Sequence, residues 1–291
     1  MRGVAAKVPT IPRPDRFRQF AAIDWSGAKG DRHRGIAVAT CDHGDLAPTL
    51  VVPPAGIWSR RAVLGWLLAQ AETPILIGID FSFSAPFVER GAHLPGEPAT
   101  ADARALWAQV DAACTDADLG AASFLEARRG THFYFGKADG AKAGFLHYRT
   151  CERAGKPSTV YDAIGAAQVA KGSFAGMRLL HHVGRGVAIW PFDPVPDEGA
   201  TIVEIYTAIA ARAAGLPKGR SKIRDAAALD AALAALGSEP HAPLARYDDH
   251  ATDAILTAAW LRAKAARDDL WAPDAMTPTV ARTEGWTFGV T

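Results

Sequence analysis

The sequence predicts an α/β fold in which a mixed sheet is flanked by helices. Short apolar runs of β character alternate along the chain with segments that have helical spacing. The run 75–79 is apolar throughout, which is typical of a strand buried on both faces of a sheet. The chain has 291 residues, 49% of them hydrophobic, and this is enough to bury one large core.

Composition narrows the class of protein. The chain has 32 basic and 31 acidic residues, so no global field draws it to nucleic acid or to a membrane, and a polyanion would need a local patch. The first 18 residues contain prolines, with no apolar segment like that of an export signal, and no membrane-spanning stretch follows. The cysteines lack the spacing of a disulfide framework or a zinc site: Cys41, Cys114 and Cys151. We therefore expect a cytoplasmic protein without a membrane anchor.

The first part of the chain predicts three strands, a helix and a fourth strand. After a flexible arm over 1–18, two β-type runs separated by a polar turn predict a hairpin. The expected strands are 20–24, 35–41, 50–52 and 75–80, with a helix over 58–71.

The second part begins with a change of composition. Residues 86–185 mix Gly, Pro, aromatic and basic residues, which predicts an inserted subdomain or long loops after the fourth strand. Regular patterns then predict strands over 187–192 and 201–206 and helices over 208–214, after 222 and over 248–265. Residues 19–272 form one predicted domain, and the tail over 273–291 is expected to wrap the surface.

Acidic residues end two of the predicted strands. Asp24 and Asp80 would lie at one edge if their strands are adjacent and parallel, and ligands bind at the carboxyl ends of strands in open α/β sheets. A single such Asp is more often a turn former or a helix cap. A third acid, Asp253, shares a face of the last helix with Asp249 and His250. An N-cap explains Asp248 or Asp249 but leaves Asp253 unexplained.

This arrangement predicts a divalent-metal site. Phosphodiester cleavage by two Mg²⁺ ions needs carboxylates that converge from several elements, whereas the same carboxylates without a metal repel one another. Glu204 lies within the predicted strand 201–206, where a buried carboxylate needs a cation or hydrogen bonds, and we include it in the candidate site.

These motifs together resemble a known family, the predicted nucleases of domain of unknown function 429, which have a ribonuclease-H-like fold. The resemblance rests on five stretches of this chain: Ala22-Ile23-Asp24-Trp25-Ser26-Gly27, Ile79-Asp80, Ala188-Ile189-Trp190-Pro191-Phe192-Asp193, Val203-Glu204-Ile205-Tyr206 and Asp249-His250-Ala251-Thr252-Asp253-Ala254. The closing stretch is also similar to the last helix of RuvC-type junction resolvases.

The resemblance covers roughly residues 18–85 and 186–267 and implies a mixed five-stranded sheet flanked by helices. It implies that Asp24, Asp80 and Asp253 bind Mg²⁺ or Mn²⁺, with Glu204 and His250 as partners in catalysis. Asp249 is a further candidate metal ligand. The chain departs from RuvC-type resolvases in carrying Asp80 where they carry Glu, and in the large insertion.

Three segments are candidates for substrate binding, each with a structural alternative. A Gly/Ala-rich stretch with Lys171 and Ser173 could present backbone N–H groups to phosphate, or could be a packed loop and helix start; it lacks the P-loop spacing. A basic run with Arg220 and Lys222 is suited to a phosphate backbone, although such runs are more often solvated loops. The aromatic and basic stretch that begins with Arg128 and Arg129 is suited to unpaired bases, but aromatic clusters more often pack a core.

The sequence therefore predicts a metal-dependent nuclease or phosphodiesterase that acts on nucleic acid or a nucleotide by a two-metal mechanism. Two alternatives stay open. One is a non-catalytic nucleotide or nucleic-acid binding module on the same fold. The other is an actin-like or sugar-kinase-like ATPase, which is disfavoured because no second copy of the strand, hairpin and acid pattern follows.

Overall fold

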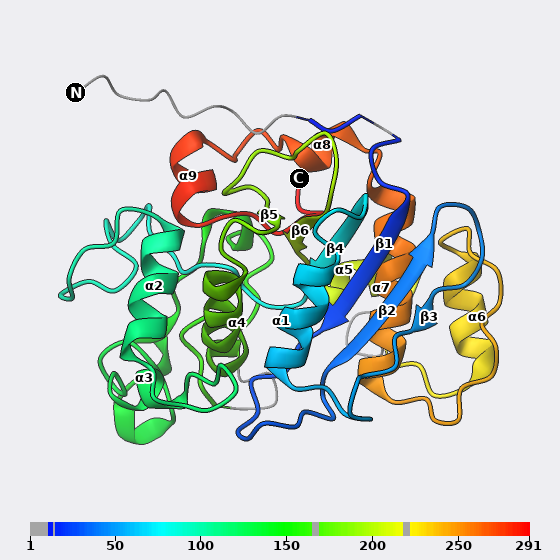
Figure 1. The fold of residues 1–291 in the computed structure, drawn as a ribbon. Helices are drawn as coiled ribbons and strands as arrows, with labels where there is room; N and C mark the ends of the chain where they lie inside the picture. Colours follow the sequence, from blue (N-terminus) through cyan, green and yellow to red (C-terminus); the bar gives the residue numbers. More distant parts are fainter. Residues whose placement is uncertain (1–10, 14, 165–168, 218–221) are drawn as a thin grey trace.

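The computed structural model describes residues 11–13, 15–164, 169–217 and 222–291, which form an α/β fold built on one mixed sheet (Figure 1). Among these residues the sheet has six strands in the order β3-β2-β1-β4-β6-β5. Their bounds are β1 Gln19–Asp24, β2 Ala37–Asp42, β3 Thr49–Leu50, β4 Ile75–Ile79, β5 Ala188–Ile189 and β6 Thr201–Glu204.

The sheet is antiparallel on one side of β1 and parallel on the other. β2 pairs antiparallel with both β1 and β3, whereas β1, β4, β6 and β5 run parallel. The five strands implied by the resemblance were wrong in number, because the strand expected over 187–192 also joins the sheet, as the two-residue strand β5 at the edge beyond β6.

Alternation along the strands divides the core into two clusters. In β1, Ala21 and Ile23 belong to the cluster shared with α1 (Arg60–Ala69) and α4 (Val169–Val183). Phe20 and Ala22 belong to the cluster shared with α5 (Thr207–Ala213), α6 (Ala226–Ala234) and α7 (Asp249–Lys264). Successive strand residues point to opposite faces, so helices cover both sides of the sheet, with α7 lying along β1 and β2 in Figure 1.

The long helix α7 begins where the sequence indicates. The Asp248 side chain accepts a hydrogen bond of 3.0 Å from the backbone N–H of Ala251, which makes Asp248 the N-cap. Ala254, Ile255, Ala258 and Leu261 are buried against the sheet. The cap and the apolar face together hold the first two turns of α7 at the carboxyl end of β1.

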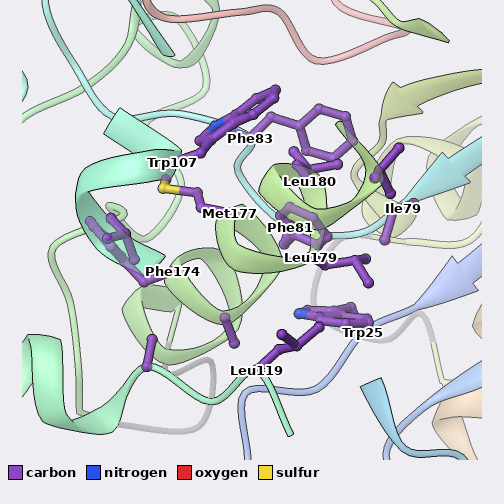
Figure 2. Packing of buried hydrophobic residues seen from close by; sticks show 14 of the residues in the cluster. Trp25, Ile79, Phe81, Phe83, Trp107, Leu119, Phe174, Met177, Leu179 and Leu180 are labelled. Carbon is purple, nitrogen blue, oxygen red and sulfur yellow. The ribbon is translucent and has the colours of Figure 1, made fainter. Parts of the chain in front are cut away.

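Residues 86–185 share the core of the sheet. They include α2 (Ala103–Ala113), α3 (Ala122–Glu126), the 3₁₀ turns η1 (Lys137–Asp139), η2 (Lys142–Phe145) and η3 (Thr150–Glu152), and α4. Figure 2 shows Phe174, Met177 and Leu179 of α4 among Trp25, Phe81 and Phe83, which follow β1 and β4. The segment is thus a helical layer over one face of the sheet rather than a separate core.

Both ends of the described chain are anchored more firmly than the sequence suggests. Arg16 is buried and donates hydrogen bonds to the carbonyls of Pro196 and Gly199, within the stretch expected to be a flexible arm. After α8 (Asp268–Trp271) and α9 (Pro278–Thr283), the tail buries Trp286 and Phe288. The expectation of a surface tail was wrong, because these aromatic rings complete the cluster around α7. None of the helices in the described ranges has the length and apolar character needed to cross a membrane.

Candidate functional site

The acids that end β1 and β4 are neighbours. Ile23 pairs with Ile79 in register, and the backbone N–H of Asp80 donates to the Ile23 carbonyl at 3.0 Å. Continuing this register by one residue places Asp24 opposite Asp80. Because Ile23 and Ile79 face α4, alternation directs both carboxyl groups toward the α7 face.

Helix α7 supplies a histidine to this pair. The Nδ1 atom of His250 lies 2.5 Å from Oδ2 of Asp24. The Asp24 side chain is only 11% exposed, whereas 47% of the His250 side chain is exposed. The Asp24 hydrogen bond raises the pKa of His250, and burial raises the pKa of Asp24 despite the opposing effect of His250. The pair of Asp24 and His250 therefore has a buried carboxyl group at one end and a solvent-facing imidazole at the other.

Asp80 and Asp253 complete an acidic group in which the charges repel. Burial, then the charge of Asp24 and that of Asp253, raise the pKa of Asp80 well above its ordinary value, although the Thr207 hydroxyl donates to Oδ2 at 3.1 Å. Burial and the charge of Asp24 raise the pKa of Asp253 to about 7. Asp24, Asp80 and Asp253, which we call the acidic triad, thus come from three elements, and the charge of Asp24 disfavours the ionisation of the other two.

Asp249 has partners of its own. Its carboxylate accepts hydrogen bonds from Lys222 and Arg224, both of which are exposed. Burial raises the pKa of Asp249, but the hydrogen bonds from these two cations outweigh it and the pKa is lowered. The carboxylate is thus already neutralised at the rim of the site, which differs from the role of metal ligand that we expected.

Glu204 faces the other side of the sheet. It pairs in register with Ile79 and therefore points away from Asp80. Its two carboxylate oxygens accept bonds from Arg149, at 2.5 and 2.6 Å, from the Phe83 N–H at 2.7 Å and from the Thr287 hydroxyl at 2.5 Å. The structure does not bring Glu204 to the acidic triad. The register of β6 directs its side chain to the opposite face of the sheet, where it forms a buried ion pair with Arg149.

The two candidates on α4 lie beside the loops that follow β1 and β4. The carbonyl of Gly172 accepts a hydrogen bond of 3.0 Å from Trp25 Nε1, and the Ser173 hydroxyl accepts one of 3.2 Å from the Ser82 N–H. Ser173 is buried, so it holds the loop after Asp80 instead of contacting a substrate. Lys171 precedes this contact and is partly exposed at the start of α4.

The basic candidates of the inserted layer are structural. Arg128 forms a two-point ion pair with Glu97 at 2.7 and 2.8 Å, and its guanidinium lies over Phe124. Arg129 bonds to Asp139 at 2.9 Å. The aromatic residue Phe133 of the same stretch is fully buried, which confirms the packing alternative for it. Arg220 lies outside the described residues.

Sequence reasoning missed Thr207. Its hydroxyl is a direct partner of Asp80, and it begins helix α5 three residues after the end of β6. A hydroxyl residue just beyond an acid-bearing strand was the available signal, since such positions lie at the same edge as the other strand ends.

The donor set of the acidic triad suits a hard divalent cation in its chemistry. Carboxylate oxygens are the ligands that Mg²⁺ and Mn²⁺ prefer, and a cation would relieve the repulsion that raises these pKa values. Over the ranges that the structure describes, no three His, Cys, Asp or Glu side chains are arranged so that they could hold a metal ion. Cation binding would therefore require the carboxyl groups to turn toward one another.

Comparisons of the chain with protein-family models, with curated proteins and with solved structures give no match.

Proposed function

We propose that this protein is a metal-dependent nuclease or phosphodiesterase on a ribonuclease-H-like core. The order of elements supports the fold: three strands, a helix and a fourth strand, with acids at the ends of the first and the fourth. The parallel pairing of β1 with β4 supports a shared site, since Asp24 ends the first of these strands and Asp80 follows the second.

One observation carries the proposal. Asp24, Asp80 and Asp253 converge on the α7 face from three separate elements. Burial raises the pKa of each, and the charge of Asp24 raises the pKa of Asp80 and of Asp253 further. A group of carboxyls that disfavours its own ionisation is costly to a fold, so it points to a function. A divalent cation is the ligand that would stabilise the ionised form of all three together.

Each residue of the site has a role in this proposal. Asp24, Asp80 and Asp253 would hold Mg²⁺ or Mn²⁺, which supplies Lewis acidity and activates water toward phosphorus. Thr207 fixes the Asp80 carboxyl through its hydrogen bond. His250, oriented by Asp24, keeps its Nε2 atom available to contact the substrate.

The positive charge that could attract a polyanionic substrate comes from a few residues near the site and not from the net charge of the chain. The chain has a formal net charge of only +1, but Lys222 and Arg224 lie at the rim of the site, bonded to Asp249 beside His250. Both side chains are more than half exposed. They are placed to contact phosphates of a bound strand, which would supply affinity without sequence preference.

The test is cleavage of labelled single-stranded, duplex and branched DNA and RNA in the presence of Mn²⁺. We expect Asp24→Asn and Asp80→Asn to abolish cleavage. Asp42→Asn is the matched control, because Asp42 is exposed at the opposite end of the sheet, where it pairs with Gln19. Its activity should equal that of the wild type.

Calorimetry measures whether the wild type binds Mn²⁺, and this defines the result that would contradict the proposal. No cleavage of any substrate, together with no Mn²⁺ binding by the wild type, would overturn the catalytic proposal. The fold would then serve as a non-catalytic binding module.

A further inference from the structure

A small gap at Gly35, in the turn before β2, faces two polar side chains of the site. A Cβ atom placed on Gly35 would lie 3.2 Å from the Ser26 hydroxyl oxygen and 3.4 Å from both Cε1 and Nε2 of His250. The two side chains come from the loop after β1 and from the first turn of α7. They therefore converge on one point from segments more than 200 residues apart in sequence.

Gly35 keeps this gap open. Its φ angle lies outside the left-handed region that favours glycine, so its backbone conformation does not itself require glycine. What the position lacks is the methyl group that any other residue would place against Ser26 and His250. The missing side chain is thus the structural feature that leaves room there.

Both side chains have hydrogen-bonding capacity to spare. The Ser26 oxygen accepts from the Ala28 N–H at 3.3 Å, and no acceptor for its hydroxyl hydrogen is found among the residues that the structure describes. His250 uses Nδ1 for Asp24, and within the same ranges its Nε2 atom has no hydrogen-bond partner. Both residues are accessible to solvent, so a ligand can reach them.

The loop that carries Ser26 is held rigidly. Arg60 is fully buried and donates to the Ser26 carbonyl at 3.1 Å and to the Ala28 carbonyl at 2.5 Å. On the other side, Gly27 lies against the backbone of Lys171 and Gly172, where a Cβ would be only 2.2 Å from the Gly172 nitrogen. The backbone that carries the Ser26 side chain is therefore fixed in place, a requirement for a precise contact with a ligand.

We propose that the Ser26 hydroxyl and His250 Nε2 together hold one non-bridging oxygen of a phosphodiester in the gap above Gly35. The inference rests on the proposed function, because it assigns the place where the phosphate of that substrate docks. Ser26 and His250 bind the oxygen, and Gly35 is a positioning residue that acts by leaving space. The contact lies next to Asp24, so the phosphorus atom would be held beside the acidic triad.

The probe is dimethyl phosphate, which has the diester group without a base or sugar. Wild-type protein labelled with ¹⁵N-histidine is titrated in the presence of Mg²⁺, and the His250 Nε2 resonance is followed by NMR. We expect a saturable shift for the wild type. Ser26→Ala should weaken binding about tenfold or more, the effect of losing a hydrogen bond to a charged group. Gly35→Ala should abolish the shift because its methyl group fills the gap.

Gly65→Ala is the matched control, because Gly65 lies in α1 with nothing within 4 Å of its Cβ position. It should titrate like the wild type. Thermal melting checks that each variant is folded, and Ser26→Ala, which only removes an atom, keeps the test decisive if Gly35→Ala unfolds. A titration of Ser26→Ala or of folded Gly35→Ala that matches the wild type, or no shift in the wild type, would overturn the inference.

The outcome is separable from that of the proposed function. Cleavage lost in Asp24→Asn with unchanged phosphate binding in Gly35→Ala would leave the nuclease standing and reject this phosphate contact. A Gly35-dependent shift in a protein that cleaves no substrate would support the phosphate contact and reject the nuclease.

Discussion

Two buried acidic centres of this protein, one on each face of the sheet, are built on opposite principles. On the α4 face, Glu204 is 2% exposed and its oxygens are saturated by Arg149, Thr287 and a backbone N–H. On the α7 face, burial raises the pKa values of the three carboxyls of the acidic triad, and the charge of Asp24 adds to the shifts of Asp80 and Asp253. The surroundings of Glu204 stabilise its charged form, whereas the surroundings of the acidic triad favour the neutral form of its carboxyl groups.

The contrast separates structural from functional acids. A buried carboxylate with a matched guanidinium and full hydrogen bonding is a stable part of the core. Carboxyls whose surroundings favour the neutral form reduce stability when they ionise, and such sites are kept where a ligand or a reaction uses them. Glu204 belongs to the first class, and we infer that Asp24, Asp80 and Asp253 belong to the second.

The largest change in stability is expected when the ion pair between Arg149 and Glu204 is broken. Arg149→Met leaves Glu204 and Glu152 buried without their cation, because Arg149 bonds both carboxylates. Removing one partner of a buried ion pair costs about 3–5 kcal/mol, and we expect a loss of that size in the free energy of unfolding measured in urea. Arg129→Met, which breaks the partly exposed pair with Asp139, is the control and should lose far less. Equal losses for the two variants would contradict the contrast.

A substitution in the acidic triad is expected to raise stability instead of lowering it. The pKa of Asp253 is about 7 in the folded protein against an ordinary 3.8, so its stabilising effect is fully present below pH 3.8 and is lost as the pH rises through 7. Without metal at pH 8, Asp253→Asn should therefore stabilise the protein by about 1–3 kcal/mol, after allowance for partial solvent screening.

Denaturation in urea with a chelator, at pH 8 and pH 5, measures this gain. The stabilisation by Asp253→Asn should shrink at pH 5, where the wild-type carboxyl is protonated. A destabilised variant at pH 8 would show that Asp253 is paired like Glu204.

Metal affinity should depend on pH for the same reason. A cation must displace the proton of Asp253, whose pKa is about 7, so Mn²⁺ binding by the wild type should weaken about tenfold between pH 8 and pH 6 for this carboxyl alone. Calorimetry at the two pH values measures the change. Affinity that is independent of pH would mean that Mn²⁺ binds away from the acidic triad.

The smallest effect is expected at the rim. Asp249 pairs with Lys222 and Arg224, whose side chains are more than half exposed, and exposed pairs contribute about 0–1 kcal/mol. Asp249→Asn should therefore change the free energy of unfolding by less than about 1 kcal/mol and leave Mn²⁺ affinity within severalfold. A loss of Mn²⁺ binding as large as that of Asp24→Asn would return Asp249 to the set of metal ligands.

Local patterns in the sequence were sufficient for the α/β class, for the strands that carry Asp24 and Asp80, and for the start of α7 at its Asp248 cap. These features depend on residues that are close together in the chain, namely apolar periodicity, an acid at a strand end and a side chain that accepts from the next turn. The sequence also indicated Asp253, because the cap explains Asp248 and not an acid one turn further on.

Only the tertiary structure decided which acids act together. The register of β6 turns Glu204 toward Arg149, which is 55 residues away, and one residue of shift would have turned it toward Asp80. Arg128 and Arg129 were likewise assigned to Glu97 and Asp139 by packing within the inserted layer. The gap at Gly35 has the same origin, because Ser26 and His250 meet only when α7 packs along β1. Composition and periodicity are local properties of the chain, whereas the partner of a buried charge is set by contacts between distant segments.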